Sequence, residues 1–258
     1  DGSLSSQILT GLLIASPLAQ KDTIFTVHKL QSKAYIDMTI QIMQDFGITV
    51  SHTNYETFSI ACNQSYTPQN YVVEGDWSGA SFHLVAGAIA GTITITNVRN
   101  DSKQADMALV EALRLAGAKI KLHNNSITIS KQELNAFHFD ATDCPDLFPP
   151  LVSLAAHCKG VTTIKGVNRL QHKESNRALV LQTEFAKLGT KIILDADIMY
   201  IHGGTLTGGR IHANNDHRIA MAGAVAALLA KQPIEIENPE CVAKSYPHFW
   251  EDFTQICK

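Results

Sequence analysis

The sequence predicts an α/β protein made of repeated units of about 70 residues around buried helices, in two domains of which the first is incomplete. Three observations predict this fold class. First, polar residues recur at a fixed interval of about 70 positions. Second, each 70-residue unit contains an Ala- or Leu-rich apolar run directly after one of these polar residues. Third, a short segment rich in β-branched residues follows each apolar run. With 45% apolar and 17% charged residues, the composition is that of a folded globular protein, not a disordered one.

Two rows of polar residues define the repeat. The first row consists of lysines spaced 70, 70 and 71 positions apart: Lys33, Lys103, Lys173 and Lys244. The second row consists of polar residues spaced 70 positions apart: Ser6, Asp76, Asp146 and Asp216. Because both rows keep the same phase along the chain, the interval is the length of one structural unit.

The first half of each unit is predicted to be a capped, buried helix followed by a strand. The apolar runs after the second row are Ile8–Ala19, Ala80–Ala90, Leu147–Cys158 and Ile219–Ala230. Apolar residues cover nearly all sides of these helices, which is typical of burial, and the polar residue before each run is suited to cap it. The strands expected next are Thr23–Val27, Thr92–Thr96, Thr162–Ile164 and Ile234–Ile236.

The second half of each unit is predicted to be a loop with the lysine, an amphipathic helix and a hairpin. The second unit shows apolar residues at helical spacing: Leu109, Ala112, Leu113 and Ala116. A glycine ends this helix, as expected for a left-handed C-cap. The hairpin follows as Lys119–Leu122 and Ser126–Ser130, joined by a turn at Asn124-Asn125. Each unit therefore has the order helix, strand, helix, strand, strand.

The repeat also predicts the domain limits. Complete units occupy residues 5–75, 76–145 and 146–215, and residues 216–258 hold a fourth that stops after its second helix. A strand meets the next capped helix at Glu74-Gly75-Asp76. We expect residues 1–75 to be the last unit of a first domain and residues 76–258 to form most of a second.

Charge and cysteine content exclude several classes of protein. The 21 Lys and Arg against 24 Asp and Glu give a net charge of −3, so no basic surplus favours nucleic acid or an anionic membrane. The five cysteines are scattered, with no pairing or metal-ligand spacing. Ile8–Ala19 lacks the preceding positive charges of a signal peptide, and Trp77–Val98 is too polar to span a membrane. We expect a cytoplasmic protein without a metal.

Charged and polar side chains gather at equivalent ends of the units. The third unit carries Arg169, Lys173, Glu174 and Arg177, the fourth carries Asn214–Arg218 and Lys244, and the first carries Ser5–Gln7 and Ser32–Tyr35. Helix N-termini and arginines bind phosphate and carboxylate groups, so this face is predicted to bind a polyanionic small molecule. The alternative is that the caps only stabilise helices, by about 0.5–2 kcal/mol each, and that the cations form solvated ion pairs.

Two carboxylates among these cations are candidates for proton transfer. Asp146 precedes a buried helix, and Glu174 is adjacent to Lys173. Simpler roles compete with this interpretation: Asp146 could serve solely as the cap of its helix, and Glu174 solely as the ion-pair partner of Lys173. The sequence leaves both alternatives open.

In combination, these motifs resemble the 5-enolpyruvylshikimate-3-phosphate synthase family, from Asp1 to about Ile256. The motifs are Ser5-Ser6-Gln7, Ser32-Lys33-x-Tyr35, Pro145-Asp146, Lys173-Glu174-Ser-x-Arg177, Asn215-Asp216-His217-Arg218-x-Ala-Met221 and Ala243-Lys244-Ser-x-Pro247. The resemblance implies an enolpyruvyl transferase-like inside-out α/β barrel with three βαβαββ units in each of two domains. It implies transfer of the enolpyruvyl group of phosphoenolpyruvate to the 5-hydroxyl of shikimate 3-phosphate, with no metal or organic cofactor.

The resemblance also assigns roles to individual residues. Residues expected to bind shikimate 3-phosphate are Ser5, Ser6, Ser32, Tyr35, Asp146, Arg169 and Lys173. Residues expected to bind phosphoenolpyruvate are Gln7, Arg177, Arg218 and Lys244. Asp146 would take the proton of the 5-hydroxyl, Glu174 would protonate the methylene carbon, and Lys173 would take part in both binding and proton transfer.

The sequence departs from the family in two ways. Gln171 and Asn176 stand where many members have Arg and Asp. A six-unit parent of roughly 420 residues would exceed this chain by about 160, so we expect Asp1 to mark a cut in the first domain and the isolated chain to be inactive. The complete protein is expected to be a monomer.

Two alternatives to the synthase remain. One is a folded fragment that only binds anions. The other is the sister enzyme that transfers enolpyruvate to UDP-N-acetylglucosamine, which lacks the Lys-Glu-Ser-x-Arg and Asn-Asp-His-Arg pairing found here.

Overall fold

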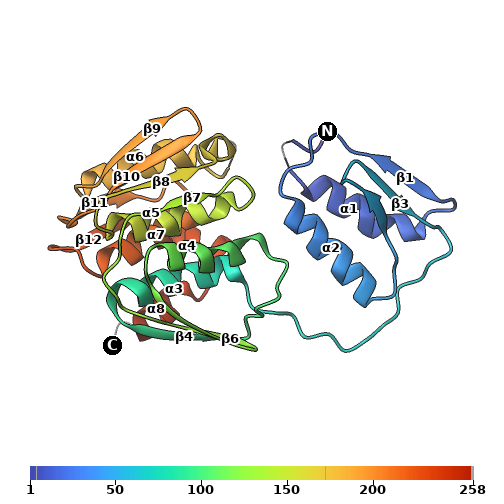
Figure 1. Ribbon diagram of the computed structural model, residues 1–258, viewed down its shortest axis with the longest axis horizontal. Coiled ribbons are helices and arrows are strands. Elements are labelled where there is room, and N and C mark those ends of the chain that lie inside the picture. The colour runs from blue at the N-terminus through green and yellow to red at the C-terminus, as the bar shows by residue number, and fades with distance from the viewer. Residues whose placement is uncertain (4, 172, 257–258) are drawn as a thin grey trace. The chain divides into compact units, whose positions relative to one another are not determined.

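A computed structural model describes residues 1–3, 5–171 and 173–256. The chain divides into two compact units, drawn in Figure 1. Unit 1 comprises Asp1–Val73 with Asp101–Ala105, and unit 2 comprises Glu74–Asn100 with Asp106–Lys258. The functional roles assigned to residues 1–75 and 76–258 stay predictions. No helix in the described part of the chain is long and apolar enough to cross a membrane.

Unit 1 contains one copy of the repeat, in the predicted order. Its elements are α1 (Gln7–Ala15), a 3-10 helix (Ser16–Leu18), β1 (Thr23–Thr26), α2 (Lys33–Asp45), β2 (Ser51–Thr53) and β3 (Thr57–Ile60). The strands form an antiparallel sheet in the order β1-β3-β2. Leu13, Ile36 and Phe58 are fully buried in the core between the helices and this sheet. Lys33 is the first residue of α2, so its predicted place in the loop before this helix is wrong.

The prediction that α1 is buried on all sides is wrong for the described residues. Only Leu9 and Leu13 of this helix are buried, whereas Ile8 is 73% and Leu12 46% exposed. The reason is that unit 1 holds a single copy of the repeat, so its described residues provide no second central helix to pack on the outer face of α1. An apolar face of this kind costs free energy in water, because its burial is what favours folding.

Unit 2 contains two complete copies of the repeat and part of a third. The helices are α3 (Trp77–Ala90), α4 (Leu109–Leu115), α5 (Phe148–Ala156), α6 (Arg177–Lys187), α7 (His217–Ala227) and α8 (Phe249–Ile256). The strands are β4 (Thr92–Thr96), β5 (Lys119–His123), β6 (Ser126–Ser130), β7 (His138–Asp140), β8 (Val161–Lys165), β9 (Lys191–Asp195), β10 (Ile198–His202), β11 (Gly209–His212) and β12 (Ile234–Glu237).

The buried helices of unit 2 lie at its centre, as the sequence predicts. Helices α3, α5 and α7 contact one another, and the sheets lie outside them (Figure 1). Every residue of α5 is buried. The Ser153 hydroxyl on α5 donates to the Ala222 carbonyl on α7 at 2.8 Å, which satisfies a polar group inside this apolar centre. In these two helices and α3, apolar residues on all sides therefore do indicate burial.

Three separate sheets surround the helices, in the orders β4-β6-β5, β7-β8-β10-β9 and β11-β12. The predicted hairpin is confirmed, with Lys119 opposite Ser130 and the turn at Asn124-Asn125. Two strands were not predicted: β7 follows one hairpin and pairs parallel with β8, and β11 follows the next and pairs parallel with β12. Each of these strands joins one unit to the sheet of the following unit.

Candidate functional site

The charged cluster of unit 2 lies where its central helices begin. Asp76 caps α3, accepting hydrogen bonds from the backbone N–H groups of Ser78 at 3.1 Å and Gly79 at 2.7 Å. Asp216 caps α7 in the same way through the N–H of Arg218 at 3.1 Å. These two caps are confirmed. In unit 1, Ser6 precedes α1 but its hydroxyl makes no capping hydrogen bond.

Asp146, the third aspartate of the row, does not cap its helix. It lies inside the 3-10 helix Pro145–Leu147, and the residue before α5 is Leu147. Helix α5 begins Phe148-Pro149-Pro150, and the two prolines have no N–H group to cap. The plain N-cap alternative is therefore wrong, and the carboxylate of Asp146 is left for other contacts.

The Asp146 carboxylate contacts three cations. Lys173 Nζ lies 3.1 Å and Arg177 Nη1 2.8 Å from Oδ1, and Arg218 Nη2 lies 3.4 Å from Oδ2. Burial by itself would raise the pKa of Asp146, but the positive charges of Arg218, Lys173 and Arg177 outweigh it and hold the pKa far below its usual range. Asp146 is therefore ionised at neutral pH.

Arg177 is fully buried and holds the cluster together. Its Nε donates to Asp216 Oδ2 at 2.9 Å, its Nη2 donates to Asp216 Oδ1 at 3.2 Å, and Nη2 also donates to Glu174. Burial would lower the pKa of Arg177, but the neighbouring carboxylates raise it. Because Glu174 pairs with Arg177 and Lys173 pairs with Asp146, the simple Lys173–Glu174 pair is not what the structure shows.

Two further groups complete the cluster. Ser175 donates its hydroxyl to Asp216 Oδ2 at 3.0 Å. His217 Nδ1 lies 4.0 Å from Glu174 Oε1, which is too far for a hydrogen bond. Burial, together with the charge of Arg218, lowers the pKa of His217, so the neutral imidazole is favoured beside Glu174.

Lys244 and Arg169 lie next to the cluster. Lys244 ends the 3-10 helix Pro239–Lys244, and its Nζ donates to the Asn215 carbonyl at 2.8 Å, directly before Asp216. Arg169 is half-buried in the 3-10 helix Val167–Leu170, which contacts the 3-10 helix that carries Asp146. The structure thus gathers all the predicted residues of unit 2 at one end of its central helices.

The predicted residues of unit 1 lie at the starts of its two helices. Gly2 links the segment before α1 to the segment before α2, because its N–H donates to the His28 carbonyl at 2.7 Å and its carbonyl accepts from the N–H of Gln31 at 3.1 Å. The residues gathered at the starts of α1 and α2 are Ser5, Ser6, Gln7, Ser32 and Tyr35. Ser32 adopts φ +55°, an uncommon left-handed conformation for a residue other than glycine, which is found more often at functional sites.

Sequence reasoning placed Asp216 in the charged set of the fourth unit without giving it an ion-pair partner, and it missed one carboxylate of the cluster. Asp106 was missed entirely: it is 2% exposed, accepts a hydrogen bond from the Ser78 hydroxyl and interacts with the charge of Arg218. An isolated aspartate in a polar loop carries no local signal, because its partners come from distant parts of the chain.

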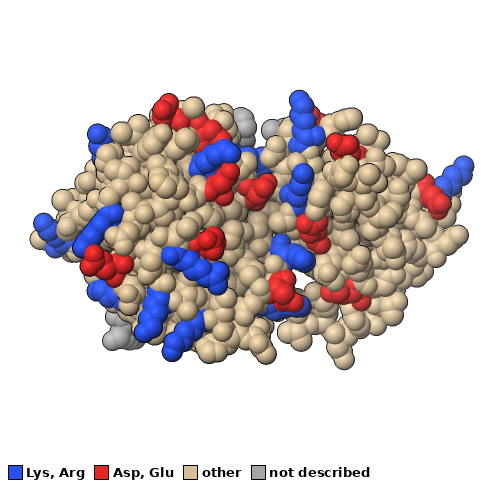
Figure 2. Space-filling model, viewed as in Figure 1, with Lys and Arg blue, Asp and Glu red and all other residues tan. Residues whose placement is uncertain are grey.

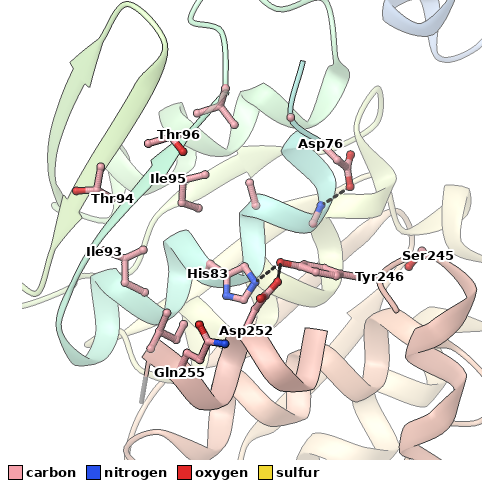
Figure 3. A pocket seen from close by; sticks show the side chains of 15 residues that line it. Asp76, His83, Ile93, Thr94, Ile95, Thr96, Ser245, Tyr246, Asp252 and Gln255 are labelled. Carbon is pink, nitrogen blue, oxygen red and sulfur yellow. Dashed lines mark hydrogen bonds between the residues drawn. The ribbon is translucent and has the colours of Figure 1, made fainter. Parts of the chain in front are cut away.

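A separate cavity of about 750 Å³ lies along β4 and α8. In Figure 3, His83 Nε2 and the Tyr246 hydroxyl approach to 3.2 Å, and Tyr246 donates to Asp252 Oδ2 at 2.7 Å. Asp146, Arg177 and Arg218 do not line this cavity. We therefore locate the candidate site at the charged cluster, where cations and carboxylates converge, and not at this cavity.

Charge elsewhere in unit 2 is dispersed. On the face shown in Figure 2, Lys and Arg side chains are interspersed with Asp and Glu. Within the described ranges, no group of three or more His, Cys, Asp or Glu side chains is placed to hold a metal ion. The cluster around Asp146 is thus suited to bind an anion through its cations and to move protons through its carboxylates.

Comparisons with known proteins identify the family. The model of the EPSP synthase (3-phosphoshikimate 1-carboxyvinyltransferase) family matches residues 1–253. A 3-phosphoshikimate 1-carboxyvinyltransferase from Clostridium perfringens (strain SM101 / Type A) is 42% identical over 258 residues, which cover 99% of this chain and 61% of the relative. The protein of the same name from Clostridioides difficile (strain 630) is 40% identical over 99% of this chain and 59% of that relative.

Solved structures confirm the predicted enolpyruvyl transferase-like α/β fold. An EPSP synthase from Acinetobacter baumannii superposes with a TM-score of 0.84 at 26% identity, covering 98% of this chain and 60% of that protein. The enolpyruvyl transferase NikO from Streptomyces tendae has the same fold, with a TM-score of 0.75 at 18% identity. This match covers 98% of the present chain and 60% of NikO. The chain spans about 60% of the length of the relatives that it matches. Because the family model covers nearly the whole chain, including the charged cluster, this chain belongs to the EPSP synthase family.

Proposed function

We propose that this chain carries the catalytic carboxylates and the phosphoenolpyruvate site of a 3-phosphoshikimate 1-carboxyvinyltransferase. Such an enzyme transfers the enolpyruvyl group of phosphoenolpyruvate to the 5-hydroxyl of shikimate 3-phosphate and releases phosphate. The observation that carries the proposal is that Asp146 contacts Lys173, Arg177 and Arg218 at once, in a chain of net charge −3. Anion binding and proton transfer are thereby possible at one place.

Arg218 is the cation best placed to receive the anion. Its Nη1 donates to Ser78 and its Nη2 lies 3.4 Å from Asp146, a long contact, while its buried Nε has no acceptor among the described residues. Nε and Nη2 are therefore the donors of Arg218 left for two oxygens of a phosphate or carboxylate that enters beside them. Arg177, by contrast, already meets carboxylates through Nε, Nη1 and Nη2, so an anion reaches it only by displacing one of them.

Substrate binding would turn Asp146 into a base. The cations that hold its pKa down are the same ones that an incoming phosphate or carboxylate would engage. As the anion draws Arg218 and Lys173 away and adds its own negative charge, the pKa of Asp146 rises toward neutral. Asp146 then takes the proton of the attacking hydroxyl as its oxygen bonds to the central carbon of phosphoenolpyruvate, and Glu174 gives a proton to the methylene carbon. In the second half of the reaction the bond from that central carbon to the phosphate oxygen breaks, phosphate leaves, and the new methyl group returns a proton to Glu174, which restores the double bond.

The remaining predicted residues have binding roles in this proposal. Lys173 serves both substrates and the proton transfer, and Lys244 adds positive charge near the start of α7. In unit 1, the hydroxyls of Ser5, Ser6 and Ser32, with Tyr35, would hold shikimate 3-phosphate, and Gln7 would contact phosphoenolpyruvate. Arg169, beside the helix of Asp146, would contact shikimate 3-phosphate. The compartment is proposed to be the cytoplasm.

Phosphate release from phosphoenolpyruvate and shikimate 3-phosphate tests the proposal. We expect background release from the 258-residue chain and turnover from a longer form that also covers the remaining length of its relatives. If the longer form binds both substrates but shows no turnover, the proposed reaction is wrong. Titration of the shorter chain with shikimate 3-phosphate shows whether it binds ligand or is inert.

Removal of the proposed base gives a second test. In the longer form, Asp146→Asn should lower kcat by about 10²–10⁴-fold because the side chain loses its ability to accept a proton. Asp143→Asn, which changes an exposed aspartate three positions earlier, should leave kcat unaltered. Equal kcat values for Asp146→Asn and the unsubstituted enzyme would exclude Asp146 as the base.

A further inference from the structure

Asp106 lies beside the candidate site although it belongs to none of the predicted motifs. It is 2% exposed, in the 3-10 helix Ala105–Ala108, and burial raises its pKa to about 6 despite the nearby positive charge of Arg218. A buried carboxylate is costly unless it is paired, so its contacts reveal what it does in the structure. One of its oxygens, Oδ1, has no hydrogen-bond partner among the described residues.

A hydrogen-bonded chain joins Asp106 to Arg218 through Ser78. Arg218 Nη1 donates to the Ser78 Oγ, and the Ser78 hydroxyl donates its single proton to Asp106. Because the hydroxyl proton is committed to the carboxylate, the oxygen lone pairs of Ser78 face the guanidinium. The second contact of Arg218, from Nη2 to Asp146, is the long one at 3.4 Å. The guanidinium is therefore oriented mainly from the Ser78 side.

We propose that Asp106 is a positioning residue which, through the Ser78 hydroxyl, fixes the orientation in which Arg218 presents its Nε–Nη2 edge to an anionic ligand. The identity of the ligand rests on the proposed function, whereas the hydrogen bonds that link Asp106, Ser78 and Arg218 do not. Asp106 itself does not touch the substrate in this proposal. Its effect passes through the geometry of Arg218, whose orientation determines how well two oxygens of the ligand can be bound at once.

Kinetics of the longer form test this role with two single variants and their combination. Ser78→Ala removes the hydrogen bond and Asp106→Asn replaces its charged acceptor by a weaker neutral amide. Each should raise the KM for phosphoenolpyruvate about tenfold or more, the size expected when a hydrogen bond to a charged group is lost or weakened, with kcat changed much less. Because both substitutions interrupt the same series of hydrogen bonds, the KM of the double variant should be no higher than that of the single variant with the higher KM. Asp195→Asn, an exposed aspartate on β9, is the matched control and should change neither constant.

The pH dependence separates positioning from general support of the fold. The charged groups around Asp106 are Arg218, Asp146 and Asp76, and Cys144 also lies within its electrostatic reach. Protonation of Asp106 replaces a charged acceptor for Ser78 by a weaker neutral one, so the KM for phosphoenolpyruvate should rise as the pH falls through about 6. Asp106→Asn should lack this rise. Additive effects in the double variant, or an identical pH profile in Asp106→Asn, would overturn the proposal.

A measurement without substrate keeps the two proposals distinguishable. In the 258-residue chain labelled with ¹⁵N, the Nε–H signal of Arg218 reports how firmly the guanidinium is held. Ser78→Ala and Asp106→Asn should each speed its exchange with solvent about tenfold or more, whereas Asp195→Asn should not. Unchanged exchange in Ser78→Ala, which removes only a hydroxyl, would show that Arg218 is not positioned this way even if the enzyme turns over normally.

Discussion

At the scale of single residues, the charged cluster shows how burial and pairing set protonation. Asp146 is held ionised by three cations, whereas Asp106, close to the same Arg218, has its pKa raised to about 6 by burial. The two carboxylates differ because Asp146 contacts its cations directly and Asp106 reaches Arg218 through Ser78. Which carboxylate could act as a base was therefore decided by contacts, not by residue type.

A half-buried histidine outside the site, His157, should make stability depend on pH. Burial lowers the pKa of His157 from 6.5 to about 4, so the folded state favours its neutral form. The resulting stability is present above pH 6.5 and is lost as the pH falls through about 4. A shift of this size corresponds to roughly 3 kcal/mol at most.

Urea unfolding at pH 7 and at pH 4.5 measures this effect. Unit 2 should lose more free energy of unfolding on acidification in the unsubstituted chain than in His157→Gln. His123→Gln, at an exposed histidine on β5, should follow the unsubstituted chain. If His157→Gln loses as much stability as the parent, the imidazole of His157 is not the group that titrates.

At the scale of elements, the second helix of each complete unit ends as the sequence predicts. Gly47, Gly117 and Gly189 have φ of +87°, +89° and +89°, and in each case the next N–H closes a Schellman turn: Ile48 to Met43, Ala118 to Leu113 and Thr190 to Phe185. These ends were predictable because the requirement for glycine is local. The parallel strands β7 and β11 were not, since their partners belong to the following unit.

Two glycine substitutions should have opposite effects. Gly117→Ala should destabilise unit 2 by about 1–2 kcal/mol, because its φ is +89° although a Cβ would meet nothing closer than 3.7 Å. Gly11→Ala, inside α1 with no atom within 4 Å of a Cβ, should stabilise unit 1 by about 0.4–1 kcal/mol. Denaturant midpoints report both changes. Stabilisation by Gly117→Ala would mean that backbone strain does not govern this position.

At the scale of the whole molecule, the two units differ in how completely their repeats are covered. In unit 2 the helices α3, α5 and α7 bury one another, whereas in unit 1 the helix α1 leaves Ile8 and Leu12 exposed. A smaller core supplies less stability, because a smaller domain buries a smaller fraction of its surface on folding. We expect unit 1 to unfold at a lower temperature than unit 2.

Calorimetry of the 258-residue chain tests this expectation. Leu13→Ala, at a fully buried residue of unit 1, should cost about 2–5 kcal/mol and shift only the lower transition. Leu151→Ala, equally buried on α5, should shift only the upper one. Ile8→Ala, at a residue 73% exposed, should shift neither by much. A single transition moved by both core variants would show that the two units unfold together.

The sequence by itself determined the length of the repeat, the order of its elements, their glycine ends and the residues that gather at the helix starts. These features depend on spacing within one unit or on phase between units, which can be measured along the chain. Only the tertiary structure decided that Arg177 pairs with Asp216, that Ser78 meets Arg218 and that α1 stays partly uncovered. The reason is that such contacts join residues 39 and 140 positions apart, where no local periodicity fixes the partner.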